Sequence, residues 1–252
     1  MHISTLQMKK NKSKNIIAMI PARMGSARLT MKNLALLNGK PLIYYAINAA
    51  KDSEVFKRIV INSEDSLFEK IARRYGIEFY QRPAQFATST TKSDFVVYDF
   101  IVNNPCDFVV WVNPTSPLQT GEEIKHVVAY FIKENLDTLI TVNDMQVHCV
   151  FKDKPVNFKL NEVFAQTQDL IPVRSFVYSI MMWRTDIFIK TFKKRGHAFF
   201  CGKVGFCPVS KLSSIIIKRK EDLMLADFVM RVLMKDKGYK VSYDRIVKYL
   251  KK

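Results

Sequence analysis

The chain has 252 residues, of which 48% are hydrophobic and 12% aromatic, a composition typical of globular proteins and not of disordered ones. Its 40 lysines and arginines against 23 acidic residues give a net charge of +17, which favours polyanionic partners such as nucleotides, acidic sugars, nucleic acids or anionic membranes. No apolar run is long enough to span a membrane, and the polar N-terminus shows no hydrophobic signal segment. We therefore expect a cytoplasmic protein without a membrane span.

The cysteines argue against a zinc-binding protein, and the basic patches argue against a nucleic-acid-binding protein. Four cysteines fit no zinc-binding spacing, so we expect reduced thiols. The lysine-rich patches contain no nucleic-acid-binding signature, so we expect no nucleic-acid partner. A basic α/β protein that binds nucleic acid is the weakest alternative, because the net charge alone motivates it.

The chain is predicted to begin with a disordered basic leader at residues 1–14 and a buried strand at 15–20. The loop after this strand carries three cations: Arg23, Arg28 and Lys32. Open α/β sheets bind phosphorylated ligands at this end of their strands, where loop N–H groups hold phosphate oxygens and cations neutralise the charge. An ordinary strand-to-helix loop with solvated cations explains the same residues equally well.

Strands and helices then alternate up to about residue 145, which indicates a doubly wound, mostly parallel sheet. The further strands are expected at residues 58–62, 77–80, 107–112 and 138–142. The helices are expected at residues 42–51, 65–75, 93–103 and 122–133.

The alternation fails over residues 146–204, where short strand-like runs indicate an inserted β-rich lobe. A short helix is expected within it, at residues 186–193. The core then resumes, and its expected elements are strands at 205–209 and 214–217 and a helix from 221 to 234. The core therefore comprises residues 15–145 and 205–252.

Three loops follow predicted strands at one end of the sheet: residues 21–33, 81–93 and 113–118. They contain Pro-Ala-Arg-x-Gly-Ser-x-x-Leu-x-x-Lys-Asn, Arg-Pro and Asn-Pro-Thr-Ser-Pro-Leu, with Gly-Lys-Pro-Leu-Ile between the first two. This ordered set resembles the CMP-sialic acid synthetase family, the cytidylyltransferases of acylneuraminic and related nonulosonic acids such as legionaminic acid. The resemblance extends over about residues 15–235, and several ordered motifs are more specific than any single one.

The resemblance implies a nucleotide-diphospho-sugar transferase-like, Rossmann-type α/β fold with an inserted dimerisation lobe, and hence a homodimer. It also implies transfer of CMP from CTP to the anomeric hydroxyl of an acidic sugar, with release of pyrophosphate and Mg²⁺ as cofactor. In-line attack on the α-phosphorus needs neutralisation of charge more than a covalent group, a role that suits Arg23 and Lys32 as catalytic residues.

By the same resemblance, the nucleotide would be bound by Ala22, Arg23, Gly25, Ser26, Lys32, Asn33, Arg82 and Ser89. The sugar would be bound by Asn113, Thr115, Ser116 and Lys152. Phe199 and Phe200 match the family's sugar-side and dimer-contact region only loosely. Two assignments have simpler alternatives, because Arg82 also suits a salt bridge at a strand end and Lys152 also suits a solvated hairpin tip.

The chain departs from the family pattern where the family holds its metal. The family has carboxylates at two positions before its last helix, and here Ile216 and Lys218 occupy them, so we expect no metal ligand there. The further departures are Thr167 for Arg, Tyr178-Ser179 for Asn-Gly, and Ala27 and Thr30 for Lys and Pro.

These departures have two explanations. In the first, the chain is an altered enzyme in which Lys218 partly stands in for the metal as a fixed cation. Such a cation offsets phosphate charge but lacks the bridging geometry of a metal. In the second, the chain is a catalytically degenerate homologue that binds nucleotide and acts as a partner or regulator.

Overall fold

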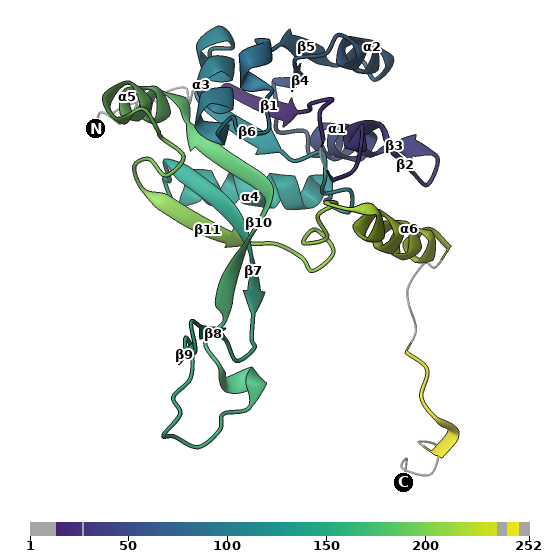
Figure 1. The fold of residues 1–252 in the computed structure, drawn as a ribbon, viewed down its shortest axis with the longest axis vertical. Helices are drawn as coiled ribbons and strands as arrows, with labels where there is room; N and C mark the ends of the chain where they lie inside the picture. Colours follow the sequence, from purple (N-terminus) through teal and green to yellow (C-terminus); the bar gives the residue numbers. More distant parts are fainter. Residues whose placement is uncertain (1–13, 27, 236–240, 247–252) are drawn as a thin grey trace, which may run out of the picture.

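The computed structural model describes residues 14–26, 28–235 and 241–246, so Ala27 and all of the predicted leader except Lys14 lie outside the described residues. A seven-stranded sheet with the order β11-β7-β10-β6-β1-β4-β5 lies between two layers of helices (Figure 1). Its strands are β1 (Ile16–Pro21), β4 (Arg58–Ser63), β5 (Glu78–Gln81), β6 (Phe108–Val112), β7 (Thr138–Met145), β10 (Val173–Arg184) and β11 (Val204–Pro208). The helices are α1 (Leu42–Asp52), α2 (Leu67–Arg74), α3 (Ser93–Asn103), α4 (Gly121–Lys133), α5 (Thr185–Arg195) and α6 (Lys220–Lys235).

The central strand β1 contributes to a hydrophobic core on each face of the sheet. Ile16, Ala18 and Ile20 pack with α1, α2 and α4, whereas Ile17 and Met19 pack with α3 and α5. Because both faces are buried, the strand is apolar throughout and does not alternate with polar residues. The parallel pairs β1–β4, β1–β6, β4–β5 and β7–β11 confirm the predicted doubly wound, mostly parallel sheet.

Strand β10 changes the expected extent of the insertion. Ile180–Arg184 pairs antiparallel with β6, and the same strand pairs antiparallel with β7, so β10 lies inside the central sheet. Trp183 is fully buried there, and Phe188 of α5 packs against it. Of the predicted lobe at 146–204, the part that begins at Ile180 therefore joins the central sheet through its pairing with β6 and β7.

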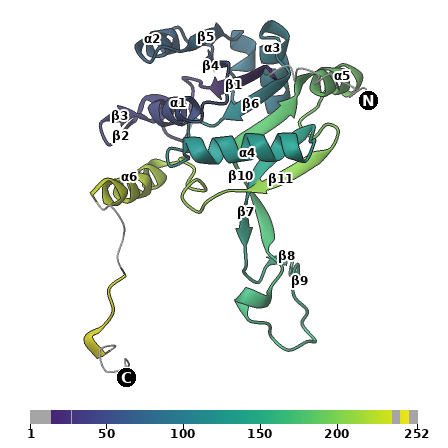
Figure 2. The same cartoon turned by 180° about the vertical axis from the view of Figure 1, so that it is seen from behind.

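Most of the remainder, residues 146–176, forms a projecting arm, and residues 177–179 form the irregular stretch of β10 that connects it to the sheet. β7 and the start of β10 run out of the sheet as a two-stranded ribbon, and β8 (Val150–Phe151) and β9 (Lys154–Pro155) lie at its far end (Figures 1 and 2). Large apolar side chains are exposed on this arm, including Phe151, Leu160, Val163, Phe164 and Ile171. The structure thus shows a protruding apolar surface, and its role in dimerisation stays a prediction.

The strand predicted at 214–217 is absent, and this prediction is wrong. Ser213 and Ile215 donate their backbone N–H groups to the Ser210 hydroxyl and to the Leu212 carbonyl, so this segment forms a turn. Serine hydroxyls that bond the local backbone compete with strand pairing. Ile217 is nevertheless fully buried, and its N–H donates to the carbonyl of Thr115 at 2.8 Å. The segment before α6 is therefore fixed against the third predicted loop.

The structure also shows the state of the cysteines and the character of the helices. All four cysteines are free, and burial raises the pKa of Cys207 to about 11 and that of Cys106 to about 12. Both are therefore protonated thiols at neutral pH. Within the described ranges, no helix has the length and apolar character needed to cross a membrane.

Candidate functional site

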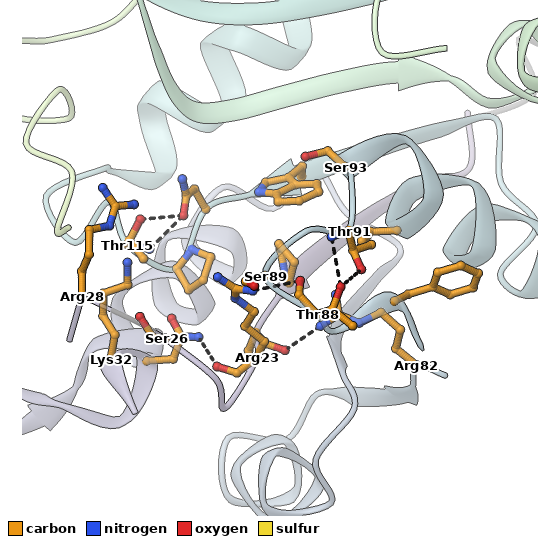
Figure 3. Close-up of a pocket in the computed structure, with 18 residues that line it drawn as sticks. Arg23, Ser26, Arg28, Lys32, Arg82, Thr88, Ser89, Thr91, Ser93 and Thr115 are labelled. Atoms are coloured by element: carbon orange, nitrogen blue, oxygen red, sulfur yellow. Dashed lines mark hydrogen bonds between the residues drawn. The ribbon is translucent and has the colours of Figure 1, made fainter. Parts of the chain in front are cut away.

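A cavity of about 280 Å³ opens at the carboxyl ends of the parallel strands β1, β5 and β6 (Figure 3). The chain leaves β1 toward β4 on one side, whereas β6 lies on the other, so the cavity sits where the strand order reverses. This is the position at which open α/β sheets bind their ligands. The lining residues are Pro21, Ala22, Arg23, Ser26, Arg28, Lys32, Asn33, Arg82, Phe86, Thr88, Ser89, Thr91, Ser93, Val96, Trp111, Asn113, Pro114 and Thr115.

All three predicted loops contribute to this cavity. Of the predicted site residues, the structure brings together Ala22, Arg23, Ser26, Lys32, Asn33, Arg82, Ser89, Asn113 and Thr115. Gly25 is exposed beside the cavity, and Ser116 is buried behind it, where its hydroxyl donates to the carbonyl of Ser213 at 2.9 Å. Lys152 does not reach the cavity, because it lies exposed in the turn between β8 and β9 with φ at 48°.

Arg23 connects the opening loop to the second loop. Its Nη1 donates to the carbonyl of Thr88 at 3.0 Å, and its own carbonyl accepts from Nδ2 of Asn33 at 3.4 Å. Asn33 is 6% exposed, and within the described chain its Oδ1 has no hydrogen-bond partner. A buried acceptor without a partner is costly, so a donor that reaches Oδ1 of Asn33 would be favourable.

Arg82 is the most deeply buried cation of the cavity. Its side chain is 4% exposed and forms a salt bridge with Glu64 at 3.0 Å, and its Nη2 also donates to the carbonyl of Ala22 at 3.3 Å. Burial lowers the pKa of Arg82, and the Glu64 carboxylate opposes this effect. The salt-bridge alternative is thus realised on the cavity wall itself. Nε of Arg82 is a buried donor that has no hydrogen-bond partner among the described residues.

Lys32 joins the opening loop to the segment before α6. Its Nζ donates to the carbonyl of Ile217 at 3.0 Å, although the two residues are 185 positions apart. Burial lowers the pKa of Lys32, and the nearby positive charges of Arg28, Arg23 and Lys218 lower it further, whereas Asp222 raises it. In Figure 3, Arg28 and Lys32 lie together on one side of the cavity, across from Arg82. The site is strongly electropositive.

Asn113 fixes the third loop and a bulge in β10. Its Oδ1 accepts from the backbone N–H and the hydroxyl of Thr115 at 3.0 and 2.9 Å, and its Nδ2 donates to the carbonyl of Tyr178 at 3.0 Å. Tyr178 has φ at 59°, a left-handed conformation that side chains rarely adopt. The residue that replaces the family's asparagine therefore lies in a strained position next to the cavity.

The residues near α6 do not fit a divalent cation. Ile216 carries no ligand atom, and the side chain of Lys218 is exposed and positively charged. Asp222 is close, but its Oδ2 already accepts the backbone N–H groups of Lys218 and Arg219, at 2.8 Å each. Over the described ranges, no cluster of three His, Cys, Asp or Glu residues could hold a metal.

The sequence analysis missed three contributors to the site. Glu64 follows β4 and holds both Arg82 and the N–H of Met24, the latter at 2.8 Å. Trp111 is near the end of β6, and its buried Nε1 has no partner in the described chain. Thr88 accepts from Arg23 and binds Thr91 through its hydroxyl. The position of Glu64 and Trp111 at or near a strand end was the one signal available for them, and Thr88 lies in the middle of the loop between β5 and α3.

Several known proteins are similar to this chain in sequence or in fold. The N-acylneuraminate cytidylyltransferase of Escherichia coli is 34% identical over 117 residues, which cover 46% of this chain and 28% of that protein. The corresponding protein of Streptococcus agalactiae is 25% identical and is matched over 91% of this chain and 58% of its own length. The CMP-N,N'-diacetyllegionaminic acid synthase of Legionella pneumophila is 37% identical over 119 residues, 45% of this chain and 51% of that protein.

These relatives are longer than the part that is matched, since the chain spans 28% to 58% of the N-acylneuraminate cytidylyltransferases above. The fold is also similar to a solved structure of CMP:2-keto-3-deoxy-manno-octonic acid synthetase complexed with CTP, with a TM-score of 0.66 and 12% identity over 86% of this chain and 98% of that one. The family model described as Cytidylyltransferase matches residues 17–187, more than half of the sequence. The chain therefore belongs to the cytidylyltransferase family.

Proposed function

We propose that the chain transfers CMP from CTP to the anomeric hydroxyl of an acidic nonulosonic sugar, such as sialic, legionaminic or a similar acid, and releases pyrophosphate. The observation that carries this proposal is the convergence of Arg23, Lys32 and Arg82 on one cavity at the switch point of the sheet. The family membership and the names of the relatives support the choice of CTP and of the sugar class.

The cavity has groups that suit a cytosine base. Cytosine presents an amino donor next to ring and carbonyl acceptors. Oδ1 of Asn33 and Nε of Arg82 are a buried acceptor and a buried donor, each without a partner in the described chain. A base that pairs with both removes two unsatisfied polar atoms at once, which favours binding. The contact with the ribose is assigned to Ser89, which lines the same cavity.

The reaction requires charge neutralisation more than covalent chemistry. The sugar hydroxyl oxygen forms a bond to the α-phosphorus, the bond from that phosphorus to the bridging oxygen of the β-phosphate breaks, and the hydroxyl proton passes to solvent. Negative charge grows on the departing pyrophosphate, where the ammonium of Lys32 and the guanidinium of Arg23 stabilise it. Mg²⁺ would supply further charge neutralisation in the family's chemistry, but positions 216 and 218 provide no ligands for it, so no step is assigned to a metal.

The acceptor sugar is assigned to the side of the cavity formed by Asn113 and Thr115. A second cavity of about 480 Å³ adjoins there, since Ser93 lines both. Its walls include Lys92, Tyr178 and Phe200, a cation with aromatic faces. Such a surface suits a carboxylate sugar that carries apolar acyl groups.

We also infer a homodimer formed through the projecting arm. Val163 is 96% exposed, and Leu160 and Ile171 are each 80% exposed, so the arm presents an apolar surface of the kind that proteins cover with a partner. A cytoplasmic location accompanies this proposal, because four free cysteines suit a reducing compartment.

The proposed function is tested by incubating the purified chain with CTP and a panel of nonulosonic acids, with and without Mg²⁺, and measuring pyrophosphate release. We expect release that depends on both CTP and one of the acids, and its loss in Lys32→Ala. Lys194→Ala is the matched control, because Lys194 is exposed on α5. Retained CTP binding without pyrophosphate release under any condition would show a nucleotide-binding homologue that does not turn over.

A further inference from the structure

The electropositive side of the cavity is organised around the ammonium of Lys32. Its Nζ lies 3.0 Å from the carbonyl of Ile217, which is the residue between positions 216 and 218. Arg23 and Arg28 line the same cavity, and Lys218 directly follows the carbonyl that Lys32 binds. A fixed cation therefore occupies the immediate surroundings of the two positions at which the family pattern carries carboxylates.

The charges around Lys32 are strongly unbalanced. Arg28, Arg23 and Lys218 are close enough to lower the pKa of Lys32 by repulsion, and among the described residues Asp222 is the one carboxylate that counteracts them. The Oδ2 atom of Asp222 is engaged by two backbone N–H groups at the start of α6. A divalent cation at this place would meet several positive charges and one carboxylate that is already hydrogen-bonded, whereas a polyphosphate would relieve the repulsion.

We propose that the cavity binds the nucleoside triphosphate in its metal-free form, with Lys32, Arg28 and Lys218 as fixed counter-cations of the polyphosphate. The inference rests on the proposed function for the assignment of the cavity to a nucleotide. A metal-free triphosphate carries more negative charge than its Mg²⁺ complex and offers all its phosphate oxygens to lysine and arginine donors. Mg²⁺ therefore competes with the protein for the triphosphate and does not assist its binding.

The first test is isothermal titration of the full chain with CTP, once in excess EDTA and once in excess Mg²⁺. We expect CTP to bind at least as tightly in EDTA as in Mg²⁺. If the metal takes the place of one charge-assisted hydrogen bond to the protein, CTP should bind about tenfold more tightly in EDTA. Tighter binding in Mg²⁺ than in EDTA would overturn this inference and leave the proposed function standing. Absence of CTP binding in both buffers would overturn the proposed function together with the inference.

The second test uses two charge reversals of equal size. Lys218→Asp and Lys194→Asp change the net charge identically, and both side chains are exposed, so both variants are expected to fold. We expect Lys218→Asp to weaken metal-free CTP binding by about tenfold, whereas Lys194→Asp leaves it nearly unchanged. Equal effects of the two substitutions would show that only the overall charge matters and would overturn the role of Lys218.

A double variant tests the same inference from the opposite direction. Ile216→Asp combined with Lys218→Asp places two carboxylates beside the carbonyl of Ile217, where oxygen ligands suit Mg²⁺. We expect this variant to bind CTP more tightly in Mg²⁺ than in EDTA, which reverses the order of the parent chain. An unchanged order in the double variant would contradict the assignment of this segment to the polyphosphate.

Discussion

Glu64 and Arg82 form a salt bridge of 3.0 Å that joins the ends of β4 and β5 beneath the candidate site. The side chains are 16% and 4% exposed, so water screens the pair only weakly. The same carboxylate accepts the N–H of Met24 at 2.8 Å and so ties down the opening loop. One acidic residue thus holds two of the three loops of the cavity in place.

Removing this carboxylate should destabilise the protein strongly. Glu64→Ala leaves Arg82 as a buried, unpaired cation, and we expect a loss of about 3 kcal/mol in the free energy of unfolding, measured by urea denaturation. Glu69→Ala is the control, because its salt bridge with Arg73 joins side chains that are 42% and 76% exposed and should contribute about 0.5 kcal/mol or less. Equal losses in the two variants would contradict the structural role of Glu64.

Backbone strain at Tyr178 should reverse the usual order of stability of an Ala and a Gly substitution. At an ordinary strand position Ala is more stable than Gly by about 0.5–1 kcal/mol. Because φ is 59° at Tyr178, we expect Tyr178→Gly to be more stable than Tyr178→Ala by about 1 kcal/mol. Ser175, in the same strand, provides the control, and there the Ala variant should have a higher free energy of unfolding than the Gly variant. If the Ala variant is more stable than the Gly variant at both positions, the backbone at Tyr178 is not strained.

Binding of CTP should depend on the protonation of Lys32. Burial, Arg28 and Arg23 lower the pKa of Lys32 from 10.5, so the folded protein holds fewer protons there than the unfolded chain. The contribution of Lys32 to stability therefore rises with pH between the lowered pKa and 10.5. A bound polyanion favours the ammonium form, so CTP affinity should fall as pH rises through the same window.

Calorimetry in buffers with different ionisation enthalpies checks this prediction through the proton uptake that accompanies binding. Lys32→Arg should remove the uptake, because arginine stays protonated throughout the window. Identical proton uptake in the parent chain and in Lys32→Arg would assign the pH dependence to another group.

The projecting arm should control the oligomeric state. We expect analytical ultracentrifugation to find a dimer for the parent chain and a monomer for the combined substitutions Leu160→Glu and Val163→Glu. Leu225→Glu is the control, because Leu225 is 53% exposed on α6, away from the arm. The unfolding free energy should change little, since the substituted side chains are exposed. A parent chain that stays monomeric would remove the arm from consideration as an interface.

The alternating part of the fold was predictable because its strands and helices differ in period and are separated by turn residues. The helices at Leu42–Asp52, Ser93–Asn103 and Gly121–Lys133 confirm the predicted ranges to within one residue. The place of β10 between β6 and β7 could not be predicted, because an apolar run does not encode which strands it pairs with. Residues 214–217 resembled a strand through three consecutive isoleucines, but serine-mediated turns determine their backbone.

The candidate site was predictable where ordered motifs mark strand ends. Arg23, Lys32, Asn33 and Arg82 line one cavity, as the loop order implied. Glu64 could not be predicted, because a single acidic residue after a strand forms no motif. Its importance comes from the burial of its partner, Arg82. Lys152 is on the arm, and its predicted contact with the sugar is not brought about within this chain.

The most direct test of the account is to identify the product formed from a mixture of CTP, UTP, ATP and a panel of nonulosonic acids by mass spectrometry. We predict a CMP ester of one acidic sugar, together with consumption of CTP, and loss of this product in Lys32→Ala. A sugar ester of another nucleotide, or no nucleotide ester with any of the acids, would contradict the assignment of the cavity to cytidylyl transfer.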